Sequence, residues 1–362
     1  MEQPAPSPSP SQRRFSLGLI GRIGLGIAIL LGLAVLVSPL LGQVPIPPLV
    51  VFRILFDQPN PCAGFSSTAF NCAAAPVIVL QARLPEILLA LIAGAALGIS
   101  GAALQGVFRN PLADPFLLGI SSGATLGASV VFVFQVGIQE ADLALPFFAF
   151  LGAGGTGLIV VLLARSGQGS VETLLLGGVA IASFLSAADA LVILYNGALG
   201  LQVDNWLLGG LGSATWPVDA IAFSFVAVFG TLLALYGAEL NLLQLGSDVA
   251  QSVGVSTSRV RISVIVLATL ITAVAVAFTG IIGFVGLVAP HIIRRTIGTD
   301  YRVVLGGSAI TGGAFLLAAR DISDVIFPTS LLPIGIFTSF AGVPVFLYLL
   351  YRQSRSVTMG GA

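Results

Sequence analysis

The sequence contains no lysine, a single histidine and only two cysteines. The missing lysine excludes a P-loop, which holds nucleotide phosphates through a Gly-Lys-Ser/Thr motif, and it also excludes Schiff-base chemistry. One histidine and two cysteines are too few for a metal cage or for a nucleophile–base pair. If ATP drives this protein, another chain must hydrolyse it.

Charged residues are also scarce, because they make up 8% of the chain, whereas soluble domains carry roughly 25%. Hydrophobic residues make up 56%, and the mean hydropathy is +1.05. The formal net charge is zero, so the composition gives no case for a nucleic-acid partner. The 44 glycines indicate tight packing of membrane helices rather than disorder. The composition predicts an all-α polytopic membrane protein whose main solvent is lipid.

Apolar runs of about 17 to 25 residues, the length that crosses ~30 Å of hydrocarbon, recur along the chain. The first follows Arg13, Arg14 and Arg22 and ends near Leu41. No small-residue cleavage pattern follows it soon, so we expect an uncleaved span. The other eight runs are 86–104, 115–134, 146–164, 173–195, 217–237, 262–280, 303–319 and 331–351.

Arginine placement decides the number of crossings, because basic residues favour the cytoplasmic side. Segment 281–293 is apolar but short, and counting it as a tenth crossing leaves only Arg53, Arg83 and Arg320 outside. With nine spans, the five inside arginines from Arg294 onward, which exclude Arg320, could not all face the cytoplasm. We therefore expect ten transmembrane helices, one of them short or irregular, with both termini inside. The inside set is Arg13, Arg14, Arg22, Arg109, Arg165, Arg259, Arg261, Arg294, Arg295, Arg302, Arg352 and Arg355.

The expected organisation is a disordered cytoplasmic tail at 1–12, a transmembrane domain at 13–355 and a second cytoplasmic tail at 356–362. The outer loop 42–82 holds both cysteines, and 238–258 is the longest polar inner loop. In an oxidising periplasm Cys62 and Cys72 can form a disulfide, and we favour that over two free thiols.

Three long motifs stand out. The first runs from Arg83-Leu-Pro-Glu86 to Leu118-Gly119. It spaces glycines by three or four residues on one helix face and ends in a turn that proline shapes. The second is 280–294 and the third is 332–346. The residues singled out in the first motif are Gly94, Gly98, Gly101, Gln105, Asn110 and Pro111, and Gly119, Gly123 and Gly127 repeat the glycine spacing on the next helix.

Together these motifs resemble the FecCD-type permease family, which imports iron–siderophores, haem and vitamin B12. The resemblance runs from Arg83 to Tyr351 in the family's order and spacing. It implies a type II ABC importer permease fold with ten helices in a bacterial inner membrane. It also implies a dimer of the permease, or of the permease with a close paralogue, two cytoplasmic ATPases and a periplasmic substrate-binding protein. No cofactor is then bound directly, since ATP and Mg²⁺ are used by the ATPase.

The inner loop 238–258 resembles the family's coupling segment, and we use that name for it. The residues alone predict a short amphipathic helix bounded by two glycines, which suits docking in a partner's groove. A solvated linker is the alternative. The residues assigned to ATPase coupling are Leu245, Gly246, Asp248, Ala250 and Gly254.

A Trp-x-x-Gly stretch at 206–209 resembles one that borders the translocation path in the family. Trp206, Gly209 and Gly210 are therefore candidates for that path. An interfacial anchor explains a membrane tryptophan equally well, so both interpretations of Trp206 stay open.

The outer-face charges depart from the family pattern. The family usually has arginine where Glu86 stands, and near 320–331 it has Asp, then Arg, then Glu before Leu-Pro. Here the sequence is Arg320-Asp321-Ile-Ser-Asp324, and the expected arginine is absent. We therefore predict that the binding protein carries basic residues where it docks. Pairing of Arg83 with Glu86 is the competing explanation. The residues assigned to docking are Arg83, Glu86, Asp321 and Asp324.

Two isolated ionisable residues have open roles. Asp189 lies inside an apolar run and is either functional or held by a polar neighbour such as Ser186. His291 is expected to have a structural or interfacial role, since one imidazole alone cannot hold a metal. The leading function is thus an importer permease without catalytic residues, the alternative is an ion-coupled secondary transporter, and an intramembrane enzyme ranks third.

Overall fold

The structure is a computed structural model that describes residues 26, 29, 31–65, 71–135, 143–166, 171–196, 200–327 and 333–359. These residues form helices, turns and loops, with no strand among them, so the predicted all-α class is confirmed. The predicted tail at 1–12 lies outside the described residues. The last helix continues through Met359, beyond the predicted end of the transmembrane domain at residue 355.

A helix covers 31–37, and the remaining elements follow it in chain order. They are η1 (Ser38–Leu40), α2 (Pro48–Leu55), α3 (Ala75–Val77), η2 (Ile78–Arg83), α4 (Leu84–Phe108), η3 (Pro115–Leu118), α5 (Ile120–Phe134), α6 (Ala144–Ser166), α7 (Val171–Asn196), α8 (Gly200–Leu207), α9 (Trp216–Ala234), α10 (Gly237–Gln244), α11 (Ser247–Ser252), α12 (Thr257–Thr279), α13 (Val285–Thr296), α14 (Tyr301–Ile326) and α15 (Ile334–Met359).

Within the described part of the chain, six helices are long and apolar enough to cross a membrane. Leu31–Leu40, Ile120–Phe134 and Ile334–Tyr348 are shorter apolar helices. The protein is therefore a multi-pass membrane protein, although this finding does not establish ten crossings. The six long helices are Ala75–Phe108, Ala144–Leu163, Leu176–Tyr195, Trp216–Ala234, Thr257–Thr279 and Tyr301–Ile326.

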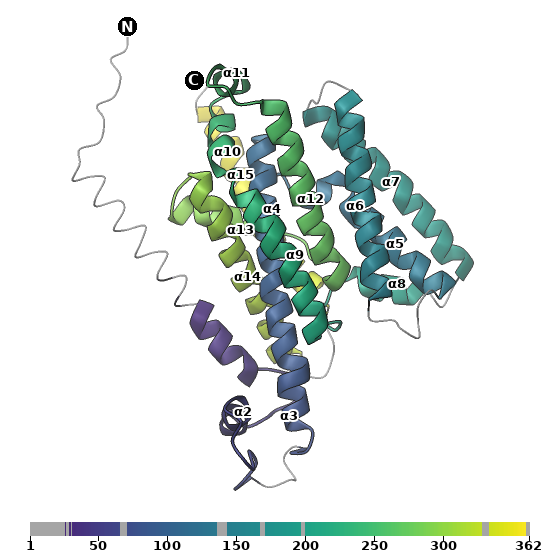
Figure 1. Ribbon diagram of the computed structural model, residues 1–362, viewed down its shortest axis with the longest axis vertical. Helices are drawn as coiled ribbons and strands as arrows, with labels where there is room; N and C mark the ends of the chain where they lie inside the picture. The colour runs from purple at the N-terminus through teal and green to yellow at the C-terminus, as the bar shows by residue number, and fades with distance from the viewer. Residues whose placement is uncertain are drawn as a thin grey trace, which may run out of the picture.

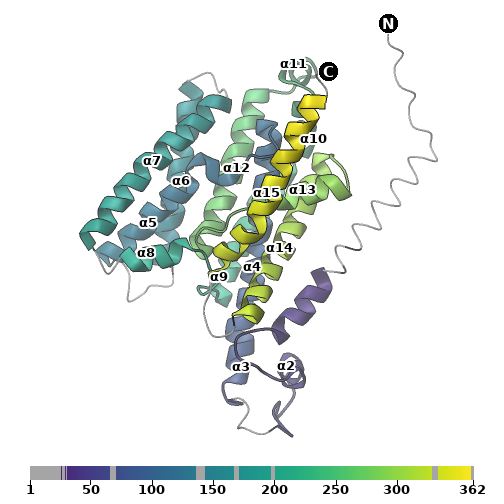
Figure 2. The ribbon, with the colours of Figure 1, turned by 180° about the vertical axis from the view of Figure 1, so that it is seen from behind.

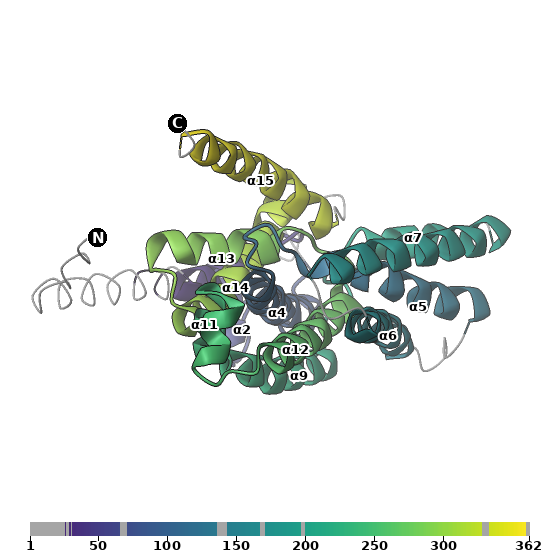
Figure 3. The ribbon, with the colours of Figure 1, turned by 90° about the horizontal axis from the view of Figure 1, so that it is seen from above.

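The helices form a bundle around α4, with α12, α13, α14 and α9 packed against it (Figure 1). The helices α5 to α8 form a group to one side. Helices α2 and α3 lie at one end of the bundle and α11 at the opposite end, and we call these the α2 end and the α11 end. Seen from behind, α15 crosses the face of the bundle beside α13 and α14 (Figure 2), and from above it lies at the periphery (Figure 3).

Glycine-to-backbone contacts hold α4 against its neighbours. A Cβ atom at Gly94 or Gly98 would overlap the backbone of α14, and one at Gly101 would overlap the backbone of α13 at Gly286. The glycines of α5 behave in the same way, because a Cβ at Gly123 or Gly127 would overlap α6. The predicted glycine faces are thus the surfaces where helix backbones meet.

At the α2 end, the described residues of loop 42–82, which are 42–65 and 71–82, form a small folded unit outside the main bundle. Val50, Val51 and Ile54 of α2 pack against Ala75 and Val79 on the extension of α4. A disulfide joins Cys62 to Cys72 beside this second core, with their Cα atoms 6.3 Å apart. The loop is thereby tied to the helix that leads into the bundle.

The glycine contacts of α4 predict that Gly98→Val lowers the free energy of unfolding by about 3 kcal/mol or more, because backbone atoms of α14 cannot yield to a new side chain. Thermal unfolding in detergent measures the change. Gly154→Val on α6 is the matched control, since a Cβ there meets no atom within 4 Å. Equal tolerance of both substitutions would contradict the interpretation.

Candidate functional site

A cavity of about 830 Å³ opens at the α2 end of the bundle. Its walls come from loop 42–44, the start of α4, the segment that follows α8, the ends of α12 and α14, and the start of α15. The cavity brings together residues predicted to dock the binding protein and residues predicted to border the translocation path. Those residues are Arg83, Glu86 and Asp324 from the docking set and Trp206, Gly209 and Gly210 from the path set.

Beside this cavity, glycines let three backbone segments meet. A Cβ atom at Gly209 would overlap the carbonyl of Ile281, one at Gly280 would overlap that of Trp206, and one at Gly335 would overlap both Leu208 and Ile281. Gly209 and Gly280 also have positive φ angles of 72° and 66°. Glycine is the residue that adopts such angles without strain, so the chain can pass here only with glycine at these positions.

The chain is not helical from Gly280 to Phe284, where the short, irregular crossing was predicted. Gly210 N donates to Thr279 O at 2.8 Å, and Ser213 Oγ donates to Phe278 O at 2.5 Å. Irregular backbone at membrane depth needs such partners, because lipid offers none. Gly210 and Ser213 therefore satisfy the last two carbonyls of α12, directly before the irregular backbone begins.

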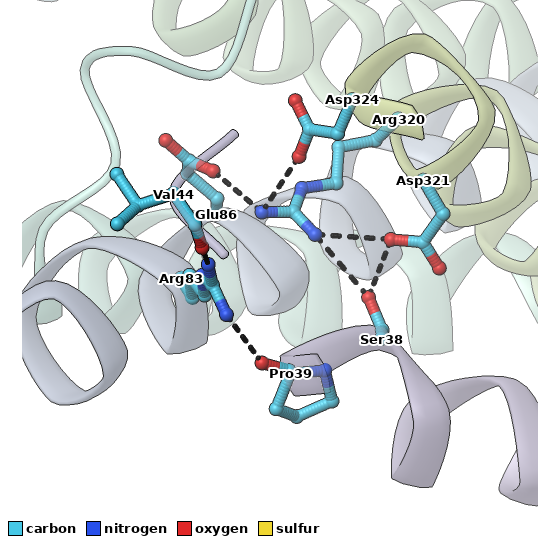
Figure 4. Close-up of polar contacts among 8 residues, drawn as sticks. All are labelled: Ser38, Pro39, Val44, Arg83, Glu86, Arg320, Asp321 and Asp324. Carbon is cyan, nitrogen blue, oxygen red and sulfur yellow. Dashed lines mark hydrogen bonds and ion pairs between the residues drawn. The ribbon is translucent and has the colours of Figure 1, made fainter. Parts of the chain in front are cut away.

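Arg320 is the centre of a charge cluster at the mouth of the cavity (Figure 4). Its guanidinium lies 2.9 Å from Glu86, 3.1 Å from Asp324 and 3.0 Å from Asp321. Ser38 Oγ donates to Asp321 Oδ1 at 2.6 Å. Arg320 is only 3% exposed, whereas Glu86 is 32% exposed. The cluster joins the first helix, α4 and α14. The sequence did not predict it, although Arg320 and Asp324 are spaced by one helical turn, which favours an ion pair.

Arg83 does not pair with Glu86, contrary to the competing explanation. It is 3% exposed and donates to Pro39 O at 2.9 Å and to Val44 O. A Cβ atom at Gly42 would overlap its guanidinium. Arg83 therefore holds the loop after the first helix, and the carboxylates assigned to docking are bound by Arg320 instead.

At the α11 end, the coupling segment contains two helices, α10 and α11, separated by Gly246 at φ 123°. The second is bounded by Gly246 and Gly254, as predicted. Ala250 is buried against the bundle, whereas Leu245, Val249 and Val253 are exposed at 67%, 45% and 60%. Val249 lies in α11, whereas Leu245 follows α10 and Val253 follows α11, so the coupling segment exposes three apolar side chains, which we call the apolar stripe.

Side-chain hydrogen bonds attach the coupling segment to the bundle. Gln244 Nε2 donates to Gly106 O on α4 at 2.8 Å, and Asn241 Nδ2 donates to Asp300 Oδ1 at 2.7 Å. The bond from Asn241 is the largest cause that lowers the pKa of Asp300. Asp300 in turn caps α14 by accepting from Arg302 N at 3.0 Å. Movement of α10 is thus linked mechanically to α4 and to α14.

Gln105 also links helices. Its Nε2 donates to Gly286 O at 3.0 Å, and its Oε1 accepts from Arg294 on α13. Asn110 closes the turn after α4 by accepting from Leu112 N at 3.0 Å, and Pro111 follows it. Among the residues of the first motif, Gln105 therefore joins α4 to the irregular crossing, and Asn110 and Pro111 shape the exit from α4.

Two carboxylates are buried within membrane-spanning helices. Asp189 on α7 accepts from Ser129 on α5, so its partner is not the proposed Ser186, which lies 3.1 Å from Ser122 instead. Asp219 on α9 was missed, although it stands in a predicted apolar run. It is 1% exposed, and neither carboxylate oxygen has a hydrogen-bond partner among the described residues.

His291 lies half-buried on α13. Among the residues that the structure describes, no three histidine, cysteine, aspartate or glutamate side chains gather as metal ligands would.

The fold and these two ends define the class, a multi-pass helical membrane protein with a cavity at one end and a short helix with exposed apolar neighbours at the other. The chain belongs to the FecCD transport family, whose pattern matches residues 29–352. The members of this family are transport permease subunits.

Similar proteins share this class. The chain is 40% identical to the hemin transport system permease protein HmuU of Yersinia pestis, over 76% of this chain and 84% of that protein. It is 41% identical to the cobalamin import system permease protein BtuC of Halobacterium salinarum, over 78% and 76%. A solved structure of a metal-chelate type ABC transporter in an inward-facing conformation matches 92% of this chain and 99% of its own, with a TM-score of 0.77 at 27% identity.

The charge cluster predicts that Arg320→Met lowers the free energy of unfolding by roughly 3–5 kcal/mol, because three carboxylates then lose the guanidinium with which each of them pairs. Thermal unfolding in detergent is the readout, and Arg302→Met, at an exposed position of the same helix, is the control. Adding Glu86→Gln and Asp324→Asn to Arg320→Met is expected to recover part of the loss. No recovery in the triple variant would show that packing of the arginine, and not its charge, matters.

The two buried carboxylates predict opposite effects of the same substitution. Asp219→Leu is expected to raise stability by roughly 1–2 kcal/mol, because it removes a desolvated group without a partner. Asp189→Leu is expected to lower stability by roughly 1–2 kcal/mol, because Ser129 loses its acceptor. A loss of stability in Asp219→Leu would mean that this carboxylate has a partner in the assembled protein.

Proposed function

We propose that this chain is the permease subunit of an ATP-binding-cassette importer that moves an iron chelate, haem, cobalamin or a related metal compound across the bacterial inner membrane. The observation that carries the proposal is the apolar stripe of Leu245, Val249 and Val253, three exposed side chains in and beside the short helix α11 at one end of the bundle. Exposed apolar side chains in and beside a short helix suit the groove of a partner protein. Family membership and the relatives' functions support the same conclusion.

The proposed assembly is a type II importer with two permease copies, two cytoplasmic ATPases and a periplasmic binding protein. In this arrangement the α11 end and both termini face the cytoplasm. The ten crossings are the six long helices, the three shorter apolar ones and α13 with its irregular entry. The permease binds no cofactor, since ATP and Mg²⁺ belong to the ATPase.

The mechanism transmits motion from the ATPase to the cavity. ATP-driven closure of the ATPases moves the coupling segment, whose attachments at Gly106 and Asp300 pass the motion to α4 and α14. Both helices end at the cavity, where Glu86 and Asp324 meet Arg320. Cargo released by the binding protein enters this cavity and passes Trp206, Gly209 and Gly210, which line it.

The docking proposal places the binding protein over the charge cluster. Glu86, Asp321 and Asp324 contribute three negative charges, and Arg83 and Arg320 contribute two positive ones, so one negative charge is in excess. Glu86 is the most exposed of the three carboxylates. We infer that basic residues of the binding protein meet Glu86 first, with Asp321 and Asp324 behind it.

The alternative, an ion-coupled secondary transporter, draws on the buried carboxylates Asp189 and Asp219. Such a transporter needs intramembrane groups that exchange ions. Asp189 is bound by Ser129, and the two carboxylates lie on different helices, α7 and α9. A response of uptake to a protonophore in the absence of ATP would favour this alternative.

The importer proposal predicts ATP-dependent uptake when the chain is reconstituted in vesicles with its ATPase and binding protein. Ferric siderophores, haem and cobalamin are the cargo series, and the radiolabelled or absorbing compound retained inside is measured. Leu245→Asp with Val249→Asp is expected to reduce uptake at least about tenfold, because charge in the stripe opposes docking. Ser258→Asp, at an exposed position at the start of α12, adds charge outside the stripe and is the control. Uptake that continues without ATP would refute the proposal.

A further inference from the structure

Two arginines beside the coupling segment share one neutral acceptor. Arg109 Nη2, at the end of α4, donates to Ser247 Oγ at 2.9 Å, and Arg261 Nη2 of α12 donates to the same oxygen at 2.9 Å. Ser247 is the first residue of α11. The three residues, which we call the arginine pair and its serine, therefore bring together α4, α11 and α12 at the α11 end (Figure 1).

This arrangement leaves two positive charges without a matching negative one. Among the described residues, every ion pair between an arginine and a carboxylate involves Arg320, at the opposite end. The Nε atom of Arg261 is buried and has no hydrogen-bond partner within that part of the chain. Like charges so close to one another repel, and a shared hydroxyl does not neutralise them.

A carboxylate would supply the negative charge and the hydrogen-bond acceptors that the two guanidinium groups of this site lack. Its two oxygens accept from two guanidinium groups at once, with charge-assisted bonds that are stronger than those to a hydroxyl. A free metabolite with a carboxylate is less suited, because Ser247, which both arginines contact, lies two residues from the exposed apolar side chains of Leu245 and Val249. Charged contacts at the rim of an apolar patch are typical of protein–protein interfaces.

Arg109 projects from the turn that Asn110 closes. Its own backbone is left-handed, with φ 48°, which a non-glycine residue rarely adopts. The turn places this exposed side chain beside α11 instead of along α4. This left-handed residue is the cap that ends α4, and it directs the arginine toward the serine of α11.

We propose that Arg109 and Arg261 together bind an aspartate or glutamate side chain of the ATPase subunit, which displaces the Ser247 hydroxyl. The inference rests on the proposed importer function and adds the chemistry of one contact. The apolar stripe supplies the contact area, and the arginine pair selects an ATPase with an acidic residue at the matching position. Before docking, Ser247 holds both arginines in place.

Ser247→Asp separates this proposal from a purely structural role. The new carboxylate satisfies both arginines from within the chain, so it strengthens the contact between α11 and the bundle and blocks the partner's acid. We expect the Kd for the purified cognate ATPase to rise about tenfold, measured with the permease in nanodiscs at about 0.15 M salt. A structural role predicts an unchanged or lower Kd, and that result overturns the proposal.

A second variant tests the arginines themselves. Arg109→Gln with Arg261→Gln is expected to raise the Kd about tenfold and to flatten its dependence on salt, because the ionic part of the contact is gone. Arg259→Gln is the matched control, an exposed arginine two residues from Arg261 on α12, and its Kd is expected to stay within about twofold of the wild type. An equal effect of Arg259→Gln would mean that only the overall positive charge matters, which also overturns the proposal.

The outcome distinguishes this inference from the importer function. If the wild-type chain and Arg259→Gln both fail to bind the ATPase, the importer function itself is refuted. If the wild type binds and both cluster variants bind equally well, only the assignment of the arginine pair is wrong. Thermal unfolding of each variant without the ATPase shows whether a loss of binding reflects a loss of folding.

Discussion

Direct contact between helix backbones is the constraint on which the rest of this structure depends. Gly94, Gly98 and Gly101 let α4 touch α14 and α13 without a side chain between them. In lipid there is no hydrophobic gain from burying one apolar helix against another, so association depends on close packing and on a few polar contacts. The glycines supply that packing, and they make α4 the axis to which the other elements are attached.

Both candidate functional ends are built on this axis. At its α2 end, α4 carries Glu86, which meets Arg320 from α14 over the cavity. At its α11 end, α4 carries the carbonyl of Gly106 and the side chain of Arg109, and both contact the coupling segment. Under the proposed function, this one helix connects the surface for the ATPase with the cavity for the cargo, which is the connection that an ATP-driven transporter requires.

The buried charges show how such a bundle tolerates polar groups. Arg320 has three carboxylate partners, and Asp189 has a serine, whereas Asp219 has no hydrogen-bond partner within the described residues. A buried charge costs stability unless it is paired, so paired groups can be structural. The cluster around Arg320 fits that role as well as docking, because it ties the first helix to α4 and α14 through Ser38 and Glu86.

The sequence by itself determined the membrane class, the glycine faces of α4 and α5, the irregular entry to α13 and the short helix between Gly246 and Gly254. These features follow from composition and from local spacing, which act within one or two turns of the chain. Only the tertiary structure decided which charges meet. Arg83 turns to the carbonyls of Pro39 and Val44, and Arg320 takes Glu86 from a helix more than 200 residues away in the sequence. Side-chain partners across helices depend on how the helices are packed, and no local pattern carries that information.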